Sequence, residues 1–367
     1  MKDRAKFFVV ALFLSLIFSV GVVCAQEDMS FEQSNVEVPL GTVDMNPDEN
    51  NENLNLNQDQ NEDNDVLKAN NEPAVKQRNH TVDGNTFDDI QSVIRDAGDG
   101  DIIFLGGKNY TGTSQIHITK SVTIVGGFSL GDGKYSTLNA QSQSNIFYSD
   151  KEDVTVYGII FINGFSADKG GAMRYGTAVN CTFIGNSAYS GGAIDDGSAV
   201  NCTFIGNIAQ KYGGALCQSS AVNCTFIGNS ANEGGALYYS SARNCTFIGN
   251  IAQEYGGAMG GFGSAFYCIF IDNIAQEYGG AMCVAGIASN STFTNNSANY
   301  GGAVYLIGIG ALINCTFENN HANDNGVLFI GKLMRSLCRK VLYGIVVSLI
   351  TLLFADLHSI LPDLQTF

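Results

Sequence analysis

The chain has 367 residues, with 35 acidic against 19 basic side chains, a formal net charge of −16 and a pI near 4.5. This acidic balance offers no stripe of lysine and arginine to neutralise phosphates, so it disfavours nucleic-acid binding. The length allows one large domain with additional tails.

The N-terminus carries Lys2, Arg4 and Lys6 ahead of an apolar run over 7–23, and Ala25 follows. A basic segment, an apolar core and a small residue in this order indicate a secretory signal peptide over 1–25. An uncleaved anchor helix is the alternative. The expected location is extracellular, at the cell surface or cell wall, with membrane attachment as a further option.

Residues 26–78 form an acidic, asparagine-rich segment. Its first 47 residues, 26–72, hold thirteen Asp or Glu and one Lys, so −12 of the net charge lies there. Such a composition buries too little apolar surface to offset the entropy lost on ordering. We therefore expect a disordered tether.

The next segment, 79–165, predicts a cap and the first coils of a β-solenoid. Phe87, Ile90, Ile94 and Ala97 recur at helical spacing after Thr86, which is a suitable N-cap. A short amphipathic helix here would cover the open end of stacked strands. Strands are expected over 101–105, 116–118 and 122–125. Gly98-Asp99-Gly100-Asp101, an Ile-x-Ile strand and Gly126 together resemble the N-terminal segment of pectin-lyase-like β-helices.

A repeat organises residues 166–331. Gly-Gly-Ala recurs at a spacing of 21–23 residues, and a fixed period in this range predicts a solenoid. Its first glycines are Gly170, Gly191, Gly213, Gly234, Gly256, Gly279 and Gly301. Within each copy, residues such as Val200, Cys202 and Phe204 alternate with Asn201 and Thr203, which indicates a strand with one buried face.

A period near 22 residues suits about three short strands plus turns per coil, stacked in parallel about 4.8 Å apart. The predicted fold class is therefore all-β, a parallel β-helix of about ten coils. Its core should contain ladders of identical residues, with amide hydrogen bonds passing from coil to coil along the asparagines. The asparagine ladder is Asn186, Asn207, Asn229, Asn250, Asn273, Asn296 and Asn320. The cysteine ladder is Cys181, Cys202, Cys224, Cys245, Cys268 and Cys315.

The cysteines number ten. Residues in one ladder lie within disulfide range, but side chains stacked in parallel do not readily reach the required dihedral angle. Reduced thiols that act as small apolar residues are favoured over disulfides. Metal binding is not expected, since no Cys-x-x-Cys pair occurs and no His lies between His117 and His321. No cofactor is predicted.

Gly-Gly-Ala followed by an aliphatic residue, paired with Phe-x-x-Asn, resembles the polymorphic outer-membrane-protein (PMP) repeats of chlamydial autotransporters. The same pair marks adhesin-like surface proteins of methanogenic archaea. The resemblance covers about 159–328. It implies a right-handed β-helix displayed on a cell surface with an adhesive or interaction role, and it identifies no ligand.

An enzymatic role is an alternative, because related β-helices include polysaccharide lyases and hydrolases. Such reactions need a strong base with a carboxylate cluster, or paired acids. Between 170 and 331 the basic residues are Arg174, Lys211 and Arg243. Glu254 and Glu277 occupy the same position in adjacent coils, but repetition of an exposed residue explains them more simply. Asp195 and Asp196 should point to opposite faces if the backbone there is extended, which disfavours a general-acid pair. We therefore predict no catalytic residues.

A binding role has a clearer candidate. Tyr255, Tyr278 and Tyr300 stand just before Gly-Gly in three successive coils, and Tyr212 shares their column, with Glu254 and Glu277 beside them. This stripe would stack sugar rings or a partner's side chains. The alternative is aromatic packing over the turn.

The leading prediction is a non-catalytic, adhesin-like protein that binds surface glycans or molecules of host or neighbouring cells. A polysaccharide lyase or glycoside hydrolase and a structural wall spacer are the alternatives. Asn79 and Asn109 stand in sequons and are candidate glycosylation sites in loops.

The C-terminal segment, 332–367, contains an uncharged run over 341–355. It is shorter than the roughly 20 residues of a transmembrane helix. Contact with a membrane through 341–361, an interfacial helix, a plug for the β-helix and a non-native tail all remain open.

Overall fold

The computed structural model describes residues 77–127, 134–151, 153–307, 310–326 and 328–330. The predicted signal peptide, most of the tether and the C-terminal segment lie outside the described residues. The described residues all belong to the second of two compact units, which spans 76–367.

In the described part of the chain, the strands form four parallel sheets, here named A to D, of 11, 10, 10 and 7 strands. Sheet A contains β1 (Asn79–Thr81), β2 (Ile102–Phe104), β5 (Thr123–Val125), β8 (Thr155–Tyr157), β11 (Thr177–Val179), β15 (Ser198–Val200), β19 (Ser220–Val222), β23 (Ser241–Arg243), β27 (Ala265–Phe266), β31 (Ile287–Ser289) and β35 (Ala311–Ile313). Sheet B contains β3 (Asn109–Thr111), β6 (Ser136–Asn139), β9 (Ile159–Ile162), β12 (Thr182–Ile184), β16 (Thr203–Ile205), β20 (Thr225–Ile227), β24 (Thr246–Ile248), β28 (Ile269–Ile271), β32 (Thr292–Thr294) and β36 (Thr316–Glu318).

The other two sheets are built from equally short strands. Sheet C contains β4 (Ile116–Ile118), β7 (Phe147–Ser149), β10 (Met173–Arg174), β14 (Ile194–Asp195), β18 (Leu216–Cys217), β22 (Leu237–Tyr238), β26 (Met259–Gly261), β30 (Met282–Val284), β34 (Val304–Leu306) and β38 (Leu328–Ile330). Sheet D contains β13 (Ser187–Ser190), β17 (Ile208–Tyr212), β21 (Ser230–Glu233), β25 (Ile251–Tyr255), β29 (Ile274–Ala275), β33 (Ser297–Tyr300) and β37 (His321–Asn325).

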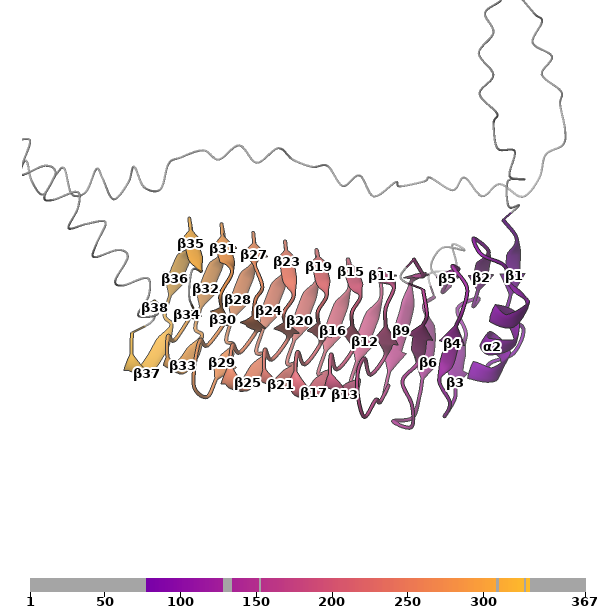
Figure 1. Ribbon diagram of the computed structural model, residues 1–367, viewed down its shortest axis with the longest axis horizontal. Coiled ribbons are helices and arrows are strands. Elements are labelled where there is room, and N and C mark those ends of the chain that lie inside the picture. The colour runs from indigo at the N-terminus through magenta and orange to yellow at the C-terminus, as the bar shows by residue number, and fades with distance from the viewer. Residues whose placement is uncertain (1–76, 128–133, 152, 308–309, 327, 331–367) are drawn as a thin grey trace, which may run out of the picture. The chain divides into compact units, whose positions relative to one another are not determined.

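These sheets confirm the predicted fold, a right-handed parallel β-helix, with about eleven coils where about ten were expected (Figure 1). Each repeat coil runs from sheet A through B and D to C. The prediction of about three strands per coil is wrong, because the residues after the buried asparagine pair with the neighbouring coils and add sheet D.

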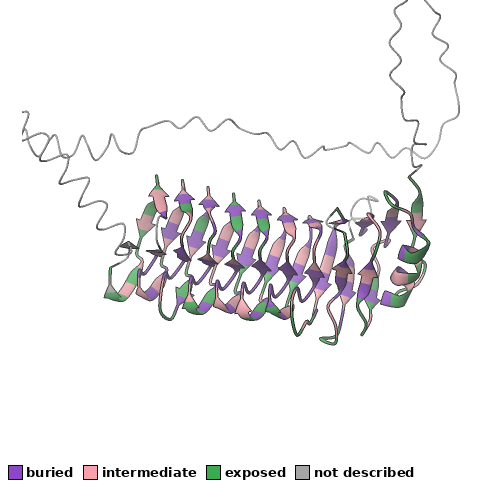
Figure 2. Cartoon of the chain, viewed as in Figure 1, coloured by how far each residue is buried: buried purple, intermediate pink, exposed green. Residues whose placement is uncertain are grey.

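Left-handed residues make the four corners of a coil. In the coil that begins at β15, these corners are Asn201, Gly206, Gly213 and Gln218, with φ between 51° and 61°. Only glycine adopts this region freely, and asparagine tolerates it better than most residues. The Asn-Cys-Thr and Gly-Gly-Ala motifs are therefore corner signals, and between the corners buried and outward-facing residues alternate (Figure 2).

The N-terminal end carries the predicted capping helix, α2 (Phe87–Asp96). Its N-cap is Thr86, whose hydroxyl accepts from the backbone N–H of Asp89 while the Asp89 carboxylate accepts from the backbone N–H of Thr86. The helix buries Phe87, Ile90 and Ile94. Gln91 exchanges two hydrogen bonds with the backbone of His117 in β4, which fixes the helix to the first coils (Figure 1).

A column of phenylalanines fills the core beneath sheet B. Neighbouring rings lie 4.7–4.9 Å apart and within 7° of parallel. The column is Phe161, Phe183, Phe204, Phe226, Phe247, Phe270, Phe293 and Phe317. Close stacking of identical rings fixes each coil in register with the next, because a shift by one residue would turn the ring to solvent.

The asparagine ladder runs beside the phenylalanine column, and its buried amides hydrogen-bond to one another from coil to coil. The Asn207 backbone N–H and side-chain amide both donate to Asn229 Oδ1, at 2.9 and 3.0 Å, and Asn207 Nδ2 also donates to the Phe183 carbonyl. The same pattern repeats along the column, and Asn186 to Asn296 are fully buried. Each amide therefore depends on the coils on both sides of it.

The cysteine column lines the corner between sheets A and B. Its thiols are free, and a typical member, Cys202, donates to the carbonyls of Val200 and Ala178. Burial raises the pKa of the Cys202 thiol well above its usual value. Cys217 and Cys283 are also free and buried, but they lie on sheet C.

We predict that Asn229→Ala destabilises the fold by roughly 3–5 kcal/mol. It leaves two donors of Asn207 buried without partners and removes one hydrogen bond to the Phe204 carbonyl, and each unsatisfied donor costs about 1–3 kcal/mol. Urea unfolding of the full chain, followed by circular dichroism, measures the loss.

The matched control is Asn223→Gly at an exposed corner, where glycine keeps the left-handed conformation. Its cost should stay within about 1 kcal/mol. Equal losses for the two variants would contradict a structural role specific to the buried ladder.

Candidate binding face

Sheet C is narrow, and most of its strands present a single outward side chain. In β18, Leu216 fills the core and the next residue, Cys217, opposes its equivalents in the neighbouring coils. The backbone register aligns His117, Tyr148, Arg174, Asp195, Cys217, Tyr238, Gly260, Cys283 and Tyr305 in one column. This column is far less repetitive than the core ladders. Its half-buried members differ from coil to coil, whereas Asp195, Cys217, Gly260 and Cys283 are buried.

The predicted tyrosine stripe lies at the edge between sheets D and C. The rings of Tyr255 and Tyr278 are 5.4 Å apart and 12° from parallel, and those of Tyr278 and Tyr300 are 5.1 Å apart and 19° from parallel. Tyr212 shares the column, but Glu233 separates it from Tyr255. All four tyrosines are partly exposed. The stack therefore packs against itself and still presents aromatic surface to solvent.

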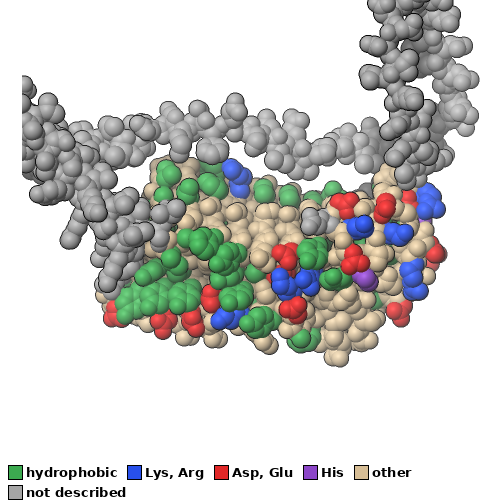
Figure 3. All heavy atoms as spheres, viewed as in Figure 1, with side chains coloured by type: hydrophobic (Ala, Val, Ile, Leu, Met, Phe, Trp, Pro, Cys, Tyr) green, Lys and Arg blue, Asp and Glu red, His purple; other side chains and the backbone are tan. Residues whose placement is uncertain are grey.

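A second aromatic group crosses sheet C from this edge. Ring contacts of 4.5–5.5 Å link Tyr212 to Tyr238, Tyr238 to Tyr239, and Tyr239 to Phe262. Phe262 is 66% exposed. The sequence analysis missed this group, although the Tyr238-Tyr239 pair after Gly-Gly-Ala-Leu was a visible signal. The hydrophobic side chains toward the C-terminal end of this face are apparent in Figure 3.

The two glutamates beside the stripe are exposed and separate from any acidic cluster. Glu254 and Glu277 use their backbone carbonyls to accept from the N–H groups of Tyr278 and Tyr300. Among the described residues, no group of three His, Cys, Asp or Glu side chains is placed to hold a metal ion.

A charged cluster occupies the middle of the same face. Lys169 Nζ lies 2.9 Å from Asp195 Oδ1 and 3.3 Å from Asp196 Oδ2. The Ser190 hydroxyl donates to the other oxygen of Asp195, whose side chain is fully buried. The expectation that Asp195 and Asp196 point to opposite faces is wrong, because Asp196 has a left-handed backbone at the corner after β14. Acidic and basic side chains gather at this position in Figure 3.

The protonation of this cluster does not favour a general base. Desolvation lowers the pKa of Lys169, but hydrogen bonds and attraction from the two aspartates outweigh it, so the pKa of Lys169 is raised. A lysine held protonated in this way cannot accept a proton. Arg174 instead lies over the rings of Tyr148 and Tyr175, at 5.7 and 5.3 Å. The sequence analysis missed Lys169, because it considered the basic residues only between 170 and 331.

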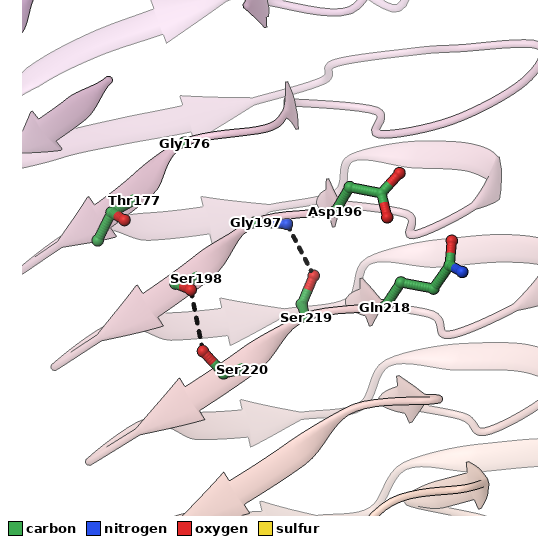
Figure 4. A pocket seen from close by; sticks show the side chains of 8 residues that line it. All are labelled: Gly176, Thr177, Asp196, Gly197, Ser198, Gln218, Ser219 and Ser220. Carbon is green, nitrogen blue, oxygen red and sulfur yellow. Dashed lines mark hydrogen bonds between the residues drawn. The ribbon is translucent and has the colours of Figure 1, made fainter. Parts of the chain in front are cut away.

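A shallow polar groove of about 360 Å³ lies at the corner between sheets C and A (Figure 4). Asp196 and Gln218 lie on one side of it, and Ser198 and Ser220, which hydrogen-bond to each other, lie on the other. Left-handed tyrosines occupy the same corner in the preceding and following coils, at Tyr175 and Tyr239. The groove therefore combines hydroxyl, amide and carboxylate groups at a corner that is occupied by tyrosine in the coils on either side.

The candidate glycosylation sites are exposed, but the prediction that they lie in loops is wrong. Asn79 opens β1 and Asn109 opens β3, the N-terminal edge strands of sheets A and B. In the described part of the chain, no helix has the length and apolar character needed to cross a membrane.

The repeat region is similar to a known family. Residues 180–195, 201–219, 223–240 and 290–306 match the Chlamydia polymorphic membrane protein repeat. The chain is thus a parallel β-helix with PMP-type repeats. No curated protein matches the sequence.

Several solved structures share the solenoid at low identity. A protein titled Geobacillus virus E2 ORF18 is 12% identical with a TM-score of 0.40, and the match covers 67% of this chain and 59% of that one. A mutant of the PL6 family alginate lyase AlyGC is 12% identical with a TM-score of 0.43, covering 68% and 40%.

A mannuronic acid specific polysaccharide family 6 lyase from human gut microbiota is 8% identical with a TM-score of 0.34, covering 66% and 83%. The chain therefore spans less than two thirds of the first two of these proteins. Likeness at these levels says nothing about the activity of this chain.

We predict that Lys169→Met lowers the free energy of unfolding by roughly 3–5 kcal/mol at pH 7, because it leaves the buried Asp195 carboxylate without its cation. Burial raises the pKa of Asp195 above its unfolded value, so Asp195 takes up a proton more readily in the fold than in the unfolded chain. The loss relative to wild type should therefore shrink as the pH falls toward 4. Urea unfolding at both pH values measures it.

Two further variants serve as controls. Lys211→Met removes a more exposed ion pair with Glu233, 3.6 Å long, and should cost much less than Lys169→Met. Adding Asp195→Asn to Lys169→Met should recover much of the loss. An equal loss at pH 7 and pH 4 would rule out an uncompensated Asp195 charge as the cause.

Proposed function

We propose that this protein is a non-catalytic, adhesin-like protein of the cell surface that binds glycans or neighbouring surfaces through the sheet C face. The match to PMP repeats supports a surface role, since those repeats are described from membrane proteins. The observation that carries the proposal is the stack of Tyr255, Tyr278 and Tyr300, spaced by one coil.

The stack fits extended, repetitive ligands. The tyrosine rings face one another within the stack, so a ligand lying along the row would contact ring edges and hydroxyl groups, which repeat once per coil. The groove at Asp196 and Gln218 adds hydrogen-bonding groups on the opposite edge of the same narrow sheet. One glycan chain crossing sheet C would meet both kinds of contact.

The charge of the central cluster also suits this role. Lys169 and Arg174 are balanced by Asp195 and Asp196, so the middle of the face carries little net charge despite the acidic chain. Uncharged or weakly charged polysaccharides are therefore the preferred ligands within the proposal.

A polysaccharide lyase is the second candidate, and the meeting of Lys169, Arg174 and Asp195 on one face favours it. The raised pKa of Lys169 and its two carboxylate partners weigh against it, because lyase chemistry needs a group that accepts a proton. A structural spacer of the cell wall is the third candidate, and it would require no ligand.

We expect the full chain to retain at least one polysaccharide from a panel of neutral and acidic glycans. Changing Tyr255, Tyr278 and Tyr300 together to Ala should weaken that binding by roughly tenfold or more, since each aromatic contact contributes about 0.5–1.5 kcal/mol. Isothermal titration with the retained glycan, and circular dichroism to check folding, provide the measurement.

The control is Tyr267→Asn, which changes an exposed tyrosine at a corner remote from sheet C to the residue found there in most other coils. It should leave binding unchanged. Release of reducing ends, tested with and without Ca²⁺, would overturn the non-catalytic proposal. Neither release nor retention of any glycan would favour the spacer or a protein partner.

A further inference from the structure

The outward face of sheet B carries an exposed apolar ladder that the binding face does not use. In the six strands from β9 to β28, each strand turns its middle Phe inward and two side chains outward. Ile184, Ile205 and Ile227 are 36–38% exposed, and Ile269 is 44% exposed. β9, β12, β16, β20, β24 and β28 follow one another along the solenoid (Figure 1).

This face is uncharged. One outward column contains only isoleucine: Ile162, Ile184, Ile205, Ile227, Ile248 and Ile271. The other contains isoleucine at both ends and threonine between: Ile160, Thr182, Thr203, Thr225, Thr246 and Ile269. A contiguous neutral patch on so acidic a chain marks an interaction surface.

The two columns also read the same in both directions. Reversing the order of the six strands exchanges Ile160 with Ile269 and leaves every outward position with the residue type it had. Beyond the patch, the next strands at each end are polar. The all-isoleucine column continues with Asn139 on β6 and Thr294 on β32, and the other column continues with Thr137 and Thr292. The palindrome is therefore bounded by polar residues on both sides.

A palindromic face matches the symmetry of a two-fold dimer. In such a dimer the same patch is used by both copies, and residue i of one copy meets residue j of the other while j meets i. The two-fold axis lies in the interface, between β16 and β20 and parallel to the strands. It places Ile205 opposite Ile227 of the partner subunit and Ile184 opposite Ile248 of the partner subunit. Every isoleucine then faces an isoleucine and every threonine a threonine.

We propose that two copies of this chain associate in antiparallel orientation through the outward face of sheet B. Flat sheets pack face to face at about 10 Å, with side chains of both filling the gap. Six strands about 10 Å long and about 4.8 Å apart cover about 300 Å² per copy, less than half of the roughly 800 Å² that a standard interface buries on each partner, so association is weak and concentration-dependent.

Antiparallel copies point their N-terminal caps in opposite directions. Two molecules carried by facing surfaces would adopt that arrangement, so the dimer would contribute to contact between like cells. This last step rests on the proposed surface role, whereas the dimer itself does not.

Sedimentation equilibrium of the full chain tests the dimer. We expect the apparent mass to rise from monomer toward dimer with increasing concentration. Ile184→Lys combined with Ile248→Lys brings like charges together across the axis and should lower the association constant by tenfold or more. Ile184→Glu combined with Ile248→Lys places opposite charges there and should associate more strongly than the double-lysine variant.

The pair 184 and 248 is chosen because three coils, about 14 Å, separate the two positions within one molecule, so a charge pair forms only between copies. Ile208→Lys, at a 52% exposed position on sheet D, should leave the mass unchanged. A monomer at every concentration would overturn the proposal. So would equal association of the Lys–Lys and Glu–Lys variants, or an equal effect of Ile208→Lys. Glycan binding by a monomer would leave the proposed function intact.

Discussion

The repeat coils from Asn186 to Asn320 depend on the buried asparagine amides that bind each coil to its neighbours. A buried amide without partners is costly, and in this chain the partners of Asn207 belong to the coils on either side of it. The ladder therefore tolerates neither a missing asparagine nor a slipped register. Once that register is set, equivalent outward residues of successive coils align in columns. The chemistry of each part of the surface then depends on which residue type occupies one position of the repeat.

That constraint explains what the sequence can and cannot predict. The period, the inward Phe and Asn and the capping helix at Thr86 follow from local rules. The corner asparagines do not, because the alternation around Asn201 predicted one continuous strand, whereas Asn201 is a left-handed corner between β15 and β16. Sheet D could not be predicted from local rules, because residues such as Ile208–Tyr212 form a strand only by pairing with the adjacent coils. Asp196 was placed wrongly because a left-handed corner, invisible in an extended pattern, turns it toward Lys169.

The candidate site was predictable where its residues occupy one position of the repeat, and not where they come from different positions. The tyrosine stripe follows from one position in the repeat, so the sequence shows it directly. The cross-face aromatic group and the charged cluster join different positions of different coils, such as Tyr212 with Tyr238 and Lys169 with Asp195. Contacts of that kind arise from how the corners bring neighbouring columns together, and a reading of single columns cannot find them.

The outward faces of sheets B and C differ in how closely their residues repeat from coil to coil. On sheet B the outward positions repeat as faithfully as the core, and a repeated column reads almost alike in both directions. Such a face has the self-complementarity that a two-fold contact needs. On sheet C the outward column changes at nearly every coil, from Arg174 through Asp195 and Cys217 to Tyr238. A column of that kind does not match its own reverse, which fits the proposal that the sheet C face binds a ligand other than a second copy.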